Sequence, residues 1–88
     1  MDNTKRMSLR KTRETAKRIA SDLDATIEVE QTGSIMTIHV DAPDGQQWAD
    51  GGVSSFRIEA RPTTGDDRTD LWQDAINRMN AGLIEAES

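Results

Sequence analysis

ATIEVEQTGSIMTIHVD, residues 25–41, alternates polar and apolar side chains on both sides of a glycine-containing turn. Alternation with a period of two places the apolar side chains of each strand on one face, so this stretch predicts a β-hairpin. The apolar face comprises Ala25, Ile27, Val29, Met36, Ile38 and Val40. A loop at Thr32-Gly33 predicts that Val29 pairs with Met36 and Ile27 with Ile38. A slip by one residue would bury glutamates, so the face is strongly specified.

A third strand is predicted after the turn-rich segment that follows the hairpin. Residues 53–61, VSSFRIEAR, place Phe56, Ile58 and Ala60 on one face, between polar side chains on the other. We therefore expect this strand to extend the apolar face of the hairpin.

Helices are predicted before and after the three strands. Residues 8–23 and 70–83 carry apolar side chains at steps of three and four, which indicates two amphipathic helices. Ser8 is the expected N-cap of the first helix, and Thr69 or Asp67 that of the second.

The resulting order, α-β-β-β-α, predicts an α+β fold. The simplest arrangement is a three-stranded antiparallel meander with both helices packed on its one apolar face. We expect a single domain over residues 8–84, a mobile N-terminal tail over residues 1–7 and a C-terminal tail over residues 85–88.

Composition narrows the class of protein. The 88 residues include no cysteine and one histidine, and the formal net charge is −5. Thiolate metal sites and cysteine nucleophiles are therefore excluded, and His39 alone is too little for a metal site, so we expect no cofactor and no catalysis. No apolar run approaches the roughly 20 residues that span a bilayer, and the charged N-terminus is unlike a secretory signal. These features predict a cytoplasmic protein without membrane contact.

The charges are unevenly distributed along the chain. Residues 1–20 carry seven Lys and Arg side chains against two acidic ones, whereas residues 21–88 carry four against fourteen. The cations on the outer side of the first predicted helix are Arg10, Arg13, Lys17 and Arg18. They are suited to bind an acidic protein or nucleic-acid phosphates. The alternative is a solvated helix surface whose cations pair with this molecule's own acids.

Trp48 is unusual because it lies in a polar, glycine-flanked loop. Tryptophan is enriched among the residues that dominate binding interfaces, so Trp48 is a candidate partner anchor. The alternative is that Trp48 folds back over the open end of the core.

The predicted order over residues 8–84 resembles that of the double-stranded RNA-binding domain. The resemblance implies RNA binding through a lysine-rich start of the second helix, but GDDRTDLWQD, residues 65–74, is acidic. No functional residue is carried over, and RNA binding in that mode is disfavoured.

Two other segments, DAPDGQQWADGG and RTDLWQDAINRMNAGLIEAES, together with eight Arg against three Lys, resemble small orphan proteins of actinobacterial phages. That resemblance implies an accessory protein that binds a host or phage component.

We therefore expect a non-enzymatic protein-interaction module with a protein partner of unknown identity, contacted through Arg10, Arg13, Lys17, Arg18 and Trp48. A nucleic-acid-binding protein that uses the basic first helix is the alternative. The edge strands also suggest a homodimer formed through a sheet edge.

Overall fold

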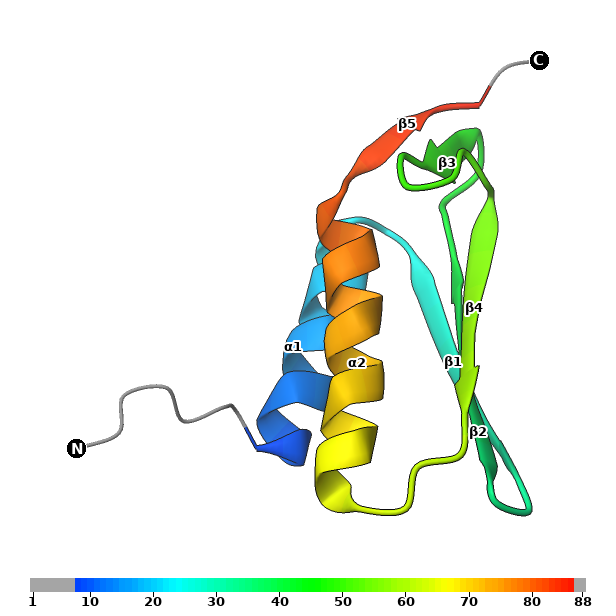
Figure 1. Ribbon diagram of the computed structural model, residues 1–88. Helices are drawn as coiled ribbons and strands as arrows, with labels where there is room; N and C mark the ends of the chain where they lie inside the picture. The colour runs from blue at the N-terminus through cyan, green and yellow to red at the C-terminus, as the bar shows by residue number, and fades with distance from the viewer. Residues whose placement is uncertain (1–7, 87–88) are drawn as a thin grey trace.

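The computed structural model describes residues 8–86, and the predicted N-terminal tail lies outside the described residues. Two parallel helices stand side by side against one face of an antiparallel sheet whose strand order is β1-β2-β4 (Figure 1). The elements of these two layers are α1 (Leu9–Asp22), β1 (Thr26–Thr32), β2 (Ile35–Asp41), β4 (Ser55–Ala60) and α2 (Gly65–Asn80). The α+β class and the placement of both helices on one sheet face are therefore confirmed.

The hairpin register differs from the predicted one. Val29 lies opposite Ile38, and Ile27 lies opposite Val40, so the strands are shifted by two residues. The two-residue turn is Gly33-Ser34, and Gly33 has φ +60°. A positive φ at the first central position suits a type II′ turn, which glycine adopts without steric cost. Because the shift is an even number of residues, the same side chains still face the helices.

The core lies between the sheet and α2. Its buried members from β2 and β4 are Met36, Ile38, Val40, Phe56 and Ile58, and those from α2 are Leu71, Trp72, Ala75, Ile76 and Met79. Val29 was expected among them, but 44% of its surface is exposed. The reason is its position near the hairpin end of an edge strand, since α2 contacts β2 and β4, whereas β1 is contacted by α1.

Helix α1 packs on α2 through small side chains. Its buried residues are Thr12, Ala16 and Ala20, at steps of four, which allow the two helix backbones to approach closely. The buried Thr12 hydroxyl donates to the carbonyl oxygen of Ser8 at 2.9 Å. Ser8 caps the helix, as predicted, and its Oγ accepts from the Lys11 N–H at 3.2 Å.

Helix α2 begins five residues earlier than predicted, and its N-cap is Thr64 rather than Thr69 or Asp67. The Thr64 hydroxyl accepts from the Asp67 N–H at 3.1 Å. The Asp67 carboxylate reaches back and accepts from both the N–H and the hydroxyl of Thr63, each at 2.9 Å. Together these bonds form a variant of the capping box. Thr69 lies inside the helix, where its hydroxyl donates to the Gly65 carbonyl at 2.9 Å.

Two short strands, β3 (Gln46–Trp48) and β5 (Leu83–Glu85), were not predicted. They pair antiparallel in a second sheet at the C-terminal end of α2 (Figure 1). Gly82, with φ +96°, turns the chain from α2 into β5. The element order is therefore α-β-β-β-β-α-β, and Glu85 belongs to a strand rather than to a C-terminal tail.

Candidate functional site: a basic groove between α1 and β1

Trp48, one of the predicted contact residues, is buried. None of its surface is exposed, and its ring packs edge-to-face on Phe56 with centroids 5.4 Å apart. The Arg78 guanidinium lies 5.4 Å from the centroid of the same Phe56 ring. The anchor interpretation is therefore wrong in this fold, because a fully covered ring presents no surface to a partner. Trp48, the last residue of β3, instead closes the end of the core where β3 pairs with β5.

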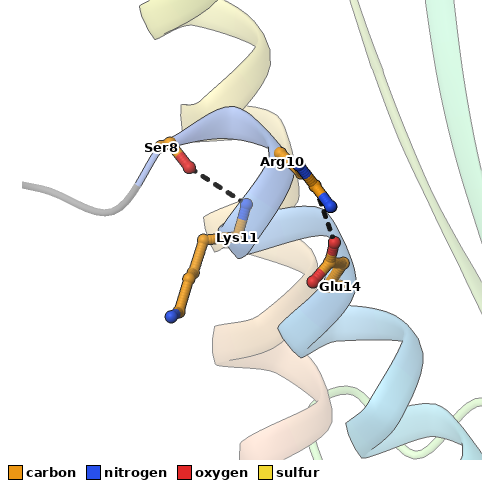
Figure 2. A network of polar contacts seen from close by, with 4 residues as sticks. All are labelled: Ser8, Arg10, Lys11 and Glu14. Carbon is orange, nitrogen blue, oxygen red and sulfur yellow. Dashed lines mark hydrogen bonds and ion pairs between the residues drawn. The ribbon is translucent and has the colours of Figure 1, made fainter.

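The four predicted cations of α1, by contrast, are all exposed. Figure 2 shows the first turns of this helix, where Arg10 Nε lies 3.1 Å from Glu14 Oε2, one helical turn away. Arg10 is thus already paired with an acid of its own helix. No acidic residue occupies the first turn of α1, although the helix dipole favours one there.

Arg13 and Lys17 line a groove of about 440 Å³ between α1 and β1. A third cation, Arg68, enters the groove from α2. The remaining lining residues are Leu9, Val29, Gln31, Met36 and Trp72. The groove therefore combines an apolar floor with three cationic side chains.

The other cations of α1 lie outside this groove. Lys11 and Arg18 line a separate, smaller depression of about 300 Å³ together with Glu14 and Thr15. Figure 2 shows the Lys11 side chain extending away from the helix. The structure thus divides the predicted contact residues into a pair that faces the groove, Arg13 and Lys17, and others that do not.

The groove cations lack ion-pair partners within residues 8–86. In that range Arg10 forms an ion pair with Glu14, and the His39 imidazole lies 3.4 Å from the Asp41 carboxylate. Neither contact involves Arg13, Lys17 or Arg68. Three positive charges without acidic partners in the described range thus lie beside apolar surface, where screening by water is weaker than in open solvent.

A second groove, of about 490 Å³, lies on the β4 side of α2 and has the opposite character. Its lining residues are Ala60, Arg61, Pro62, Asp67, Asp70, Leu71 and Asp74. The Thr63 N–H and hydroxyl, which donate to Asp67, lower the pKa of that carboxyl below its ordinary value of 3.8. This carboxylate is engaged in capping α2, so its hydrogen bonds already have a structural role.

The outer face of the sheet carries rows of polar side chains. Glu28, His39 and Arg57 lie side by side across the three strands, and His39 Nε2 is 3.4 Å from Asp41 Oδ1. Over the described part of the chain, no three His, Cys, Asp or Glu side chains are grouped as metal ligands would be.

Arg68 is the site residue that sequence reasoning missed. With α2 predicted to begin at Asp70, Arg68 fell in a loop and had no assigned direction. The available signal was Thr64, an N-cap residue type before Gly65. A helix from Gly65 places Arg68 four residues before Trp72 and hence on the same face.

Comparison with protein-family models, curated proteins and solved structures finds no match to this chain. Within residues 8–86, neither helix has the length and apolar character needed to cross a bilayer.

Proposed function

We propose that this chain is a non-enzymatic protein-interaction module that binds an acidic segment of a partner protein in the α1–β1 groove. The observation that carries the proposal is the cluster of three cations, Arg13, Lys17 and Arg68, which have no ion-pair partner among residues 8–86 and surround an apolar floor. An apolar centre with a charged rim is the usual anatomy of a protein interface. The resemblance to phage proteins adds the expectation that the partner is a host or phage component.

Nucleic-acid binding is the second candidate, because the exposed cations of α1 form a positive surface. Single-stranded nucleic acid is usually held by aromatic rings that stack on bases, as well as by cations. Trp72 is the only aromatic residue of the groove, and 2% of its surface is exposed. The groove therefore favours carboxylates that accompany apolar side chains over phosphates that accompany bases.

A matched pair of double variants tests the proposal. Arg13→Glu with Lys17→Glu reverses the two α1 cations of the groove, whereas Lys11→Glu with Arg18→Glu makes the same charge change outside it. Nuclease-treated lysate of the source organism is passed over each immobilised chain, and the retained proteins are quantified. We expect the groove variant to lose proteins that both the wild type and the control variant retain. Equal loss by both variants would contradict binding in the groove.

The nucleic-acid alternative has its own measurement. Fluorescent DNA and RNA oligonucleotides are titrated with the wild-type chain at several salt concentrations. Six phosphate contacts predict a log–log slope of about −5 for duplex DNA. The protein-interaction proposal instead expects no shift of either nucleic acid at about 50 mM salt, conditions under which phosphate contacts are strong.

A further inference from the structure

Strand β1 forms an edge of the sheet along the basic groove. Within the described residues it pairs only with β2, and every residue from Glu28 to Thr32 is exposed. An exposed edge carries backbone N–H and C=O groups that lack strand partners and accept a further strand.

The ladder identifies the outward-pointing backbone groups. The Ala42 N–H donates to the Ser54 carbonyl oxygen at 2.8 Å, and these two residues continue the register in which β2 pairs with β4. Because hydrogen-bonded positions recur at every second residue, the even-numbered residues of β2 bond to β4. Odd-numbered residues of β2 therefore bond to β1, and their β1 partners are even-numbered. The unpaired groups of the β1 edge thus belong to Ile27, Val29 and Gln31.

These outward-bonding residues are also those whose side chains face the helices. Val29 and Gln31 line the groove, whereas Glu28 and Glu30 lie on the opposite face of the sheet. In an antiparallel pair, residues directly opposite each other point to the same face. A strand added to β1 would therefore project alternate side chains over Arg13 and Lys17, and the intervening ones beside the two glutamates.

We propose that the partner's binding segment is an extended strand that pairs antiparallel with β1. It would place acidic and apolar side chains in the groove and basic side chains beside Glu28 and Glu30. This inference rests on the proposed function and names the conformation and charge pattern of the partner segment.

A second copy of this chain fits the edge less well. A symmetric β1–β1 pair would bring Glu28 and Glu30 of two copies together on the outer face, and like charges on neighbouring strands destabilise a sheet. The homodimer expected from the sequence is therefore an alternative outcome of the experiment rather than the proposed occupant.

The test is an NMR titration of the ¹⁵N-labelled full chain with the synthetic peptide acetyl-KDKLKDKL-amide. Lysine alternates in this peptide with aspartate or leucine, which gives the proposed pattern. We expect shift changes at Ile27, Val29 and Gln31, and cross-strand Hα–Hα contacts between peptide and β1. A peptide of the same composition without alternation, acetyl-KKLDDLKK-amide, is the control and should bind about tenfold more weakly or not at all.

Backbone methylation of the peptide separates strand pairing from simple charge attraction. In the proposed geometry, amides of the aspartate and leucine residues donate to β1, whereas lysine amides point to solvent. Methylating one aspartate and one leucine amide should weaken binding about tenfold, since two hydrogen bonds are lost. Methylating two lysine amides should leave affinity unchanged. Equal effects of the two methylations, or tight binding of the control peptide, would overturn strand addition.

The groove variants distinguish failure of this inference from failure of the proposed function. If the retained proteins depend on Arg13 and Lys17 but the alternating peptide does not pair with β1, strand addition is wrong and the groove remains the binding site. If neither depends on these cations, both proposals fail. Concentration-dependent shifts of β1 without peptide, with contacts between copies, would replace the partner strand by a second copy.

Discussion

Trp48 has no exposed surface, and its buried indole Nε1 has no hydrogen-bond partner among the residues that the structure describes. An unpaired buried donor costs free energy, which other contacts of the side chain must offset. The compensation is the packing of this large ring, at the end of β3, on Phe56 of β4. The sequence left two interpretations of Trp48 open because composition gives the polarity of a loop but not where the loop folds.

Trp48→Ala should therefore lower the free energy of unfolding by about 3–5 kcal/mol, the usual cost of removing a large core aromatic. Urea denaturation followed by circular dichroism measures this loss. Trp48→Phe is the control, since it keeps an aromatic ring and removes the unpaired N–H, and it should cost clearly less. An unchanged urea midpoint for the alanine variant would contradict the buried position.

The lowered pKa of Asp67 should make the stability of the fold fall on acidification. Hydrogen bonds from Thr63 lower the pKa of Asp67 in the folded state, so its contribution is present above pH 3.8 and declines as pH falls towards the lowered pKa. Asp67→Asn keeps an acceptor oxygen but does not titrate, and its melting temperature should fall less steeply on acidification below about pH 4. Asp50→Asn, an equal charge change in an exposed loop, should retain the slope of the wild type.

At the scale of elements, alternation and helical periodicity in the sequence predicted the strand faces and both helices. The hairpin register was wrong because the preference of Gly33 for the first turn position decided between two registers that bury the same face. The start of α2 was wrong because a polar first turn has no apolar period. Strands β3 and β5 are three residues each, too short for alternation to be recognised, and only tertiary pairing defines them.

The glycine between α2 and β5 gives a prediction for this junction. Gly82 has φ +96°, whereas Gly65, in the first turn of α2, has no positive φ and has open space where a Cβ would lie. Gly82→Ala should destabilise the fold by about 1–2 kcal/mol through left-handed strain. Gly65→Ala should stabilise it by about 0.4–1 kcal/mol by restricting the unfolded chain. Thermal denaturation of the two variants should shift in opposite directions, and equal shifts would contradict this account.

At the scale of the whole molecule, the β1–β2 hairpin and the second sheet lie at opposite ends of the helix pair (Figure 1). The groove lies by the β1–β2 hairpin, and Trp48 with the second sheet lies at the other end. Sequence reasoning predicted Arg13 and Lys17 on the solvent side of α1. It did not predict the groove, because Arg68 and the exposed Val29 join that site only through the contact between layers.

A substitution at Ile38 tests the core that the sheet and the helices share. It lies in the central strand with no exposed surface. Ile38→Asp buries an unpaired carboxylate and should abolish cooperative unfolding. Thr37→Asp places the same group one residue away, on the outer face, and should leave a cooperative transition. Differential scanning calorimetry distinguishes the two, and a cooperative Ile38→Asp variant would contradict the packing of helices on this face.

The small side chains by which α1 meets α2 have a consequence for local opening. The buried side chains of α1 are small, and its larger ones, Leu9 and Ile19, are only half-buried, whereas the strands and α2 bury large side chains. Detaching α1 therefore costs less free energy than disrupting the strands and α2. Amide protons of α1 should therefore exchange with solvent deuterium by a sub-global event, ahead of those in β2. Since α1 forms one wall of the groove, a ligand held there would slow that exchange and make the least stable helix the most responsive reporter of occupancy.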